Sequence, residues 1–207
     1  MALKDKAIVE RSQRMGYTHY WRREKDIAPG TYLKIVMDFQ KLLPVFEANG
    51  VKLKGGDGNG EPEFSEQGVF FNGDQHCGHE QHDLGIIWPA KQASGVSVQP
   101  VVAGSWFAGA EIEKRSCDGD CSHETFDFPL RMEPPEWQEP ENGKWFEFCK
   151  TAFKPYDWAV TAFLVIAKHY LGDKIVISSD GAIELWYDAM QLCQIELGYG
   201  LEFKLRD

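Results

Sequence analysis

Cysteine and histidine gather in two short segments of this 207-residue chain. The chain holds five cysteines and six histidines, and seven of these eleven residues lie in FNGDQHCGHEQHDLG (71–85) and SCDGDCSHETF (116–126). The seven are His76, Cys77, His79, His82, Cys117, Cys121 and His123. Thiolate and imidazole are the ligands that zinc prefers, so the two segments together are a candidate metal site.

The spacing of these residues suits a closed zinc site better than a catalytic one. Structural zinc takes four tetrahedral ligands, usually in pairs two to four residues apart. We therefore predict a structural zinc held by Cys77, His79, Cys117 and Cys121. Two alternatives stay open, namely a polar loop that is rich in histidine and a catalytic metal. The segment HEQH (79–82) is one residue short of H-E-x-x-H, which excludes a zincin.

Composition excludes several classes of protein. Acidic residues outnumber basic ones by 32 to 22, giving a net charge of −10, so nucleic-acid binding is not expected. No apolar run reaches the ~20 residues of a membrane helix, and the first 14 residues lack the apolar core of a secretory signal. An odd number of cysteines, some beside histidines, favours a reducing cytoplasm over a disulfide framework.

The pattern of apolar residues predicts an α+β fold with a mixed or antiparallel sheet and a packed pair of helices. We expect one domain over 1–207, with a β-rich insertion at 74–122 that carries both Cys/His segments. Thr31 is a plausible N-cap for a helix up to Gly50, which Pro44 should kink or divide. The other expected helices are 155–171 and 182–198, and the expected strands are 16–21, 68–73, 125–130, 174–181 and an edge strand at 199–207.

Five phrases occur in a fixed order along the chain: MGYTHYW (15–21), FNG (71–73), HETF (123–126), KPYD (154–157) and SSDG (178–181). Together they resemble a family of small proteins encoded by tailed bacteriophages. The resemblance spans most of the chain, and GYTHYW is its most specific element. It implies a phage origin and action in the cytoplasm of an infected bacterium. It carries over no activity, fold or catalytic residue. In the family, FNG is followed closely by the HETF element, whereas residues 74–122 separate them here.

The polar residues within these phrases form a second candidate site, for a small ligand. The set comprises Tyr17, His19, Asn72, His123, Glu124, Lys154, Tyr156, Asp157, Ser179 and Asp180. Aromatic and charged residues would converge if the strands that carry them share a sheet. Each also has a purely structural interpretation: Asp157 as a helix cap, Asp180 as a turn residue, His19 as a hydrogen-bonded strand residue and Lys154 as a solvated cation.

Two functions of different classes follow. The first is a non-enzymatic phage accessory protein that counters host defence by binding a nucleotide-like signal or a host defence protein. The second is a metal-dependent or acid–base enzyme acting on a small phosphorylated or nucleotide substrate with His123, Glu124 and Asp180. The absence of a nucleophile elbow, a dinucleotide fingerprint or a kinase motif favours the first. The expected partners are a small molecule or a host protein, and a second copy of the chain is a further candidate.

Overall fold

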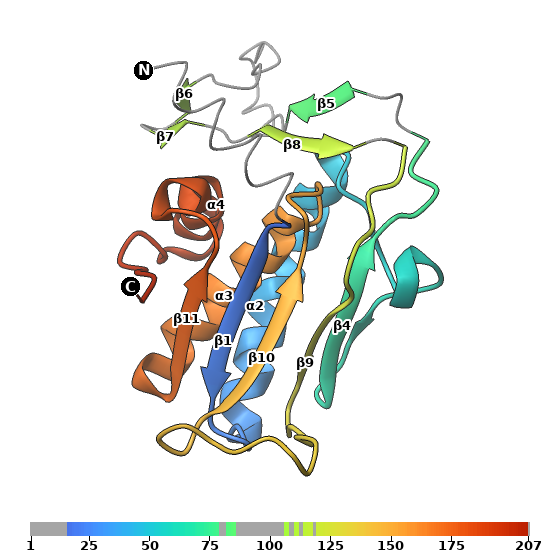
Figure 1. The fold of residues 1–207 in the computed structure, drawn as a ribbon. Coiled ribbons are helices and arrows are strands. Elements are labelled where there is room, and N and C mark those ends of the chain that lie inside the picture. Colours follow the sequence, from blue (N-terminus) through green and yellow to red (C-terminus); the bar gives the residue numbers. More distant parts are fainter. Residues whose placement is uncertain are drawn as a thin grey trace.

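The computed structural model describes residues 16–78, 82–85, 106–107, 110–111, 114–117 and 119–206. Its centre is a three-stranded antiparallel sheet in which β1 (Thr18–Arg23) lies between β10 (Trp145–Lys150) and β11 (Ile175–Ser179). Helices α2 (Pro29–Ala48) and α3 (Asp157–Leu171) pack behind this sheet, and α4 (Tyr187–Leu197) lies beside β11 (Figure 1). This arrangement confirms the predicted α+β fold.

The alternating pattern of β1 explains how the sheet meets the helices. Tyr17, His19 and Trp21 are each at most 1% exposed, while Tyr20 and Arg22, which alternate with His19 and Trp21, are partly exposed. Side chains alternate between the two faces of a strand, so the first three point to the helical layer. Trp21 meets Phe126 there with 5.4 Å between ring centroids.

Helix α3 is the centre of the core. Twelve of its fifteen residues are buried, because α2, α4 and the sheet pack around it. Helix α2 shows one apolar stripe that includes Ile35, Phe39, Leu42 and Phe46, which is the spacing of a helix with one buried face. The Phe39 ring lies edge-on to Phe163 of α3, at 5.2 Å.

A second antiparallel sheet is built around β4 (Gly68–Gly73), which pairs with β2 (Leu53–Lys54), β3 (Glu63–Phe64) and β9 (Phe126–Pro129). Two ribbons lie within the predicted insertion. Strand β5 (His82–Gly85) pairs with β8 (Lys114–Cys117), and β6 (Trp106–Phe107) pairs with β7 (Ala110–Glu111). The β5–β8 ribbon lies across the end of the central sheet where β1 begins and β11 ends (Figure 1). Short 3-10 turns cover Gly56–Gly58, Gly172–Lys174 and Ile183–Trp186.

Three local predictions need correction. Helix α2 begins at Pro29, not after Thr31, because proline is well suited to the first turn of a helix. The helix also runs undivided through Pro44, held by the packing of its buried stripe. The predicted edge strand at 199–207 is wrong for the described residues 199–206, which form turns and coil beside β11. One backbone bond joins them to it, from the Arg206 N–H to the Ile177 carbonyl at 2.8 Å.

Candidate metal centre and buried polar network

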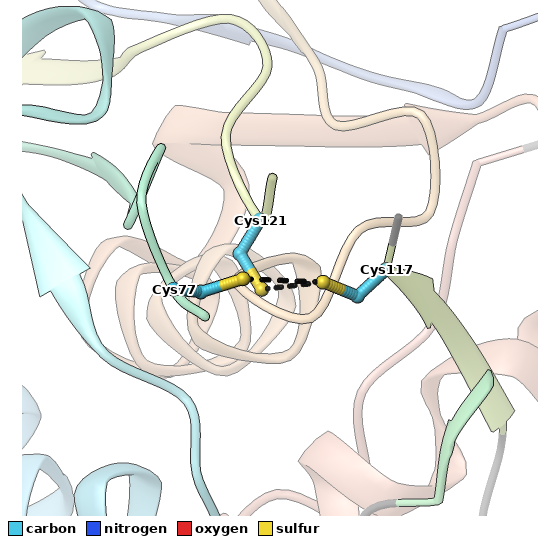
Figure 2. A group of neighbouring side chains, drawn as sticks. All are labelled: Cys77, Cys117 and Cys121. Carbon is cyan, nitrogen blue, oxygen red and sulfur yellow. Dashed lines mark hydrogen bonds between the residues drawn. The ribbon is translucent and has the colours of Figure 1, made fainter. Parts of the chain in front are cut away.

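Three cysteines from distant parts of the chain bring their sulfur atoms together. The Sγ atom of Cys117 lies 3.3 Å from that of Cys77 and 3.2 Å from that of Cys121, and all three sulfurs lie within 4.8 Å of one another. Figure 2 shows them pointing at a common centre. A tetrahedral zinc with Zn–S bonds of about 2.3 Å separates its sulfurs by about 3.8 Å. The cluster could therefore hold a metal ion after small shifts of the side chains.

The backbone around the cluster is fixed to the second sheet. Cys77 lies in the turn after β4, Cys117 ends β8, and Cys121 belongs to the loop before β9. The Cys121 N–H donates to the Asp74 carbonyl at 3.0 Å. Gly73 allows this approach, because a Cβ atom there would stand 1.9 Å from the Cys121 carbonyl oxygen.

The surroundings of Cys117 and Cys121 disfavour the thiolate forms of these two residues. Burial, together with the neighbouring Cys117 and Cys77, raises the pKa of Cys121 well above its ordinary value. Burial likewise raises the pKa of Cys117. A bound cation reverses this effect, since thiolates are the metal ligands and metal binding releases their protons. Three thiols around one centre are a donor set that suits a soft or borderline metal.

The structure tests only part of the prediction about the histidines of the two segments. His79 lies outside the described residues. His123 is not at the cluster: its Nδ1 is 2.7 Å from the Lys150 carbonyl oxygen. In the antiparallel register of β5 and β8, His82 stands directly opposite Cys117.

Below the cluster lies a buried network centred on Asp157, the first residue of α3. Its Oδ1 is 2.6 Å from Nε2 of His19 and accepts a hydrogen bond from Thr151 at 2.5 Å. Asp157 does not cap its helix as one interpretation proposed, because its carboxylate serves these neighbours. The Nδ1 atom of His19 lies 3.1 Å from Oγ of Ser179, its directly opposite residue on β11. Four predicted residues thus meet here, since the Tyr17 ring lies edge-on to His19 at 4.8 Å.

Two charged residues of this network were missed from sequence. Arg115 of β8 is wholly buried; its Nε donates to Asp157 at 3.1 Å and its Nη1 pairs with Asp188 of α4. Burial would lower the pKa of Arg115, but the two carboxylates outweigh it and raise the pKa. Burial raises the pKa of Asp188 as well, whereas His19 and Arg115 outweigh burial at Asp157 and lower its pKa. Asp188 lies among apolar residues on the buried side of α4. This position could have indicated a buried ion pair from the sequence, because a buried carboxylate requires a partner.

The remaining predicted ligand residues bind the protein itself. The Asn72 side chain donates to the His123 carbonyl at 2.8 Å and accepts from its N–H at 3.0 Å. The Glu124 carboxylate accepts from the Lys150 N–H at 2.6 Å, and Tyr156 donates to the Glu124 carbonyl at 2.6 Å. These bonds join β4, β10 and the loop before β9.

Lys154 and Asp180 also have internal partners. The Lys154 ammonium donates to the carbonyl of Asp120, next to Cys121, at 2.8 Å. The Asp180 carboxylate accepts from the Thr18 N–H and from the Tyr20 hydroxyl, each at 3.1 Å. All ten predicted residues therefore lie at the same end of the central sheet, in two groups whose polar atoms serve mainly to join strands and loops.

Comparison of the chain with protein-family models, curated proteins and solved structures finds no match. Within the part of the chain that the structure describes, no helix combines the length and the apolar character needed to cross a bilayer.

Proposed function

We propose that this protein is a zinc-stabilised binding protein in which the metal fastens the insertion to the α+β frame. The convergence of Cys77, Cys117 and Cys121 is the observation that carries the metal site. Cys77 and Cys121 lie near the two ends of the insertion at 74–122, and Cys117 is the last residue of its strand β8. A metal bound by all three joins both ends of the insertion to one point. Structural sites of this kind contribute folding energy directly.

A fourth ligand completes the tetrahedron, and the two segments offer histidines for it. His79 lies two residues after Cys77, which is the spacing of a zinc ligand pair. His82 lies opposite Cys117 in the register of β5 and β8. Single His79→Ala and His82→Ala variants separate the two. The variant that removes the true ligand should weaken zinc binding by at least the roughly 10–100-fold that loss of an outer-shell partner costs, and the other should not.

Native mass spectrometry of the untagged protein, beside the same sample denatured, tests the metal site. We expect one zinc per native chain, absent from a Cys117→Ser/Cys121→Ser variant. Cys193→Ala is the matched control, because Cys193 is buried against the Ala162 carbonyl in the core, away from the cluster. Zinc retained by the double variant, or no zinc in the wild type, would exclude this site.

For the biological role we propose phage counter-defence, by binding a nucleotide-like signal or a host defence protein in the infected cell. The resemblance to tailed-phage proteins supports a role in the infected cell. Most polar side chains of the predicted set form hydrogen bonds within the protein, which favours binding over catalysis. Extraction of purified protein should release an unaltered ligand at no more than one equivalent per chain. Release of altered product beyond one equivalent would favour an enzyme.

One arrangement favours an acid–base enzyme as the second candidate. Ser179, His19 and Asp157 form a hydroxyl–imidazole–carboxylate series, with the carboxylate on Nε2 and the hydroxyl on Nδ1. Such a series can activate a hydroxyl group as a nucleophile. The candidate catalytic residues are therefore Ser179 and His19. They replace His123, Glu124 and Asp180, which the sequence suggested. Turnover of a phosphorylated or nucleotide substrate that Ser179→Ala abolishes, with an unchanged melting temperature, would establish the enzyme.

A further inference from the structure

A cavity of about 470 Å³ opens between α3, β11 and the C-terminal segment 200–206. Its volume falls in the range of small-molecule sites, roughly 300–1,000 Å³. None of the ten predicted ligand residues lines it. The segment that forms one wall stands beside the edge of β11, where Figure 1 shows the chain turning back after α4.

The rim of this cavity is positively charged on an otherwise acidic protein. Lys204 and Arg206 line it, against a single carboxylate from Glu202. Lys168 also lines it, but its ammonium donates to the Gly172 and Ile175 carbonyls at 2.8 and 3.0 Å. Among the described residues, Lys204 and Arg206 have no ion-pair partner. Cations that are not neutralised within the protein raise the local concentration of anions, even where the net charge of −10 disfavours them elsewhere.

The carboxylate at the rim is already engaged. Glu202 accepts a hydrogen bond from the Gly200 N–H at 2.9 Å, and its Oε1 lies 3.4 Å from Nδ1 of His169. The His169 ring in turn stacks on Tyr199, with 3.7 Å between centroids and 8° between planes. This stack fixes the position of the C-terminal segment, so the cations that follow it are held at the cavity.

The floor of the cavity is apolar. Val165 of α3, Ile177 of β11 and Phe203 line it, and each is at most 6% exposed. An inorganic anion would gain nothing from such a floor, whereas an organic anion would bury its ring or chain on it. Phe203 stacks on Trp186 at 5.0 Å, which makes this part of the floor rigid.

We infer that the cavity binds a small phosphorylated molecule of the nucleotide class, with its phosphate at Lys204 and Arg206 and its base on the apolar floor. The inference rests on the proposed binding function and gives it a site. Lysine and arginine are the side chains that recognise phosphate, and arginine can do so through two parallel hydrogen bonds. The volume lies toward the lower end of the range for small-molecule sites, which favours a mononucleotide over a larger ligand.

Calorimetric titration of the full chain with AMP, adenosine and inorganic phosphate tests the inference. We expect AMP to bind more tightly than either fragment. A Lys204→Glu/Arg206→Glu variant should bind AMP at least ten-fold more weakly. Lys34→Glu/Lys52→Glu is the matched control, since these exposed lysines lie on α2 and before β2, away from the cavity, and the change in net charge is the same.

Each result is decisive. Undetectable AMP binding, or equal weakening by both double variants, would overturn the inference. A co-purified small molecule or host protein that the Lys204→Glu/Arg206→Glu variant retains in native mass spectrometry would overturn this site while leaving the proposed binding function in place. Unchanged AMP affinity after loss of zinc would show that AMP binding at the cavity does not depend on the metal centre.

Discussion

Arg115 and Cys117 lie two residues apart on β8, and both are buried, yet they enter different clusters. The Arg115 guanidinium reaches the carboxylates of Asp157 and Asp188, while the Cys117 sulfur joins Cys77 and Cys121. Arg115 thereby attaches strand β8 to helices α3 and α4. Cys117 attaches the same strand to the loops next to the second sheet. Any movement of β8 disturbs both clusters, so the cysteine cluster and the buried charges are linked through a single strand.

Gly73→Ala is expected to weaken metal binding, because a Cβ atom at Gly73 would stand 1.9 Å from the Cys121 carbonyl oxygen and must displace that loop. Competition with a chromophoric chelator measures the zinc affinity. Gly68→Ala on the same strand is the control, since a Cβ atom there meets nothing within 4 Å. Equal zinc affinity in the two variants would contradict the close approach.

Arg115→Met should destabilise the protein by roughly 3–5 kcal/mol, because it leaves buried carboxylates without their cation. Urea unfolding measures the loss. Arg131→Met removes an exposed pair with Asp26 and should cost less than about 1 kcal/mol. Adding Asp188→Asn to Arg115→Met should recover part of the stability. No recovery would show that the guanidinium matters for packing and not for charge.

Asn72→Ala should lower stability by roughly 1–3 kcal/mol and leave AMP affinity unchanged, because this buried amide satisfies backbone groups of His123 and Gly73. Thermal unfolding and calorimetry report the two effects separately. Asn59→Ala removes exposed hydrogen bonds and should change stability by no more than about 0.5 kcal/mol. A normal melting temperature with lost AMP binding would return Asn72 to the ligand site.

Asp38 should make stability depend on pH. Burial alone would raise the pKa of Asp38, but hydrogen bonds from Lys41, Tyr170 and Tyr199 outweigh it and lower the pKa. A carboxyl group whose pKa is lower in the folded state stabilises the protein above its unfolded pKa, about 3.9. That stabilisation is lost as the pH falls through the folded value.

Asp38→Asn should therefore cost roughly 1.5–3 kcal/mol at pH 7 and progressively less below pH about 4. Unfolding by urea across this range of pH measures the difference from wild type. Asp173→Asn, an exposed residue of the turn after α3, is the control and should change little at any pH. A cost of Asp38→Asn that stays constant to acid pH would mean that the charge plays no part.

Periodicity within the sequence was sufficient for the helices, for the buried face of β1 and for the α+β class. These properties depend on residues that are close together in the chain. The alternation that places Tyr17, His19 and Trp21 on one face can be seen directly in the sequence. Cysteine spacing also indicated Cys77, Cys117 and Cys121, which meet in a cluster that could hold a metal ion, because ligand pairs leave a short-range pattern. His79 stays a prediction.

Only the tertiary structure decided which distant segments meet. Strand β10, which the sequence analysis missed, pairs with β1 more than 120 residues away, through a register that no local pattern specifies. The same pairing carries predicted polar residues into internal hydrogen bonds. The cations of segment 200–206 meet a cavity only because this segment folds back beside α3 and β11. Arg115 could not be recognised as buried from sequence, because the carboxylates that compensate its charge come from two helices that meet only in the folded protein.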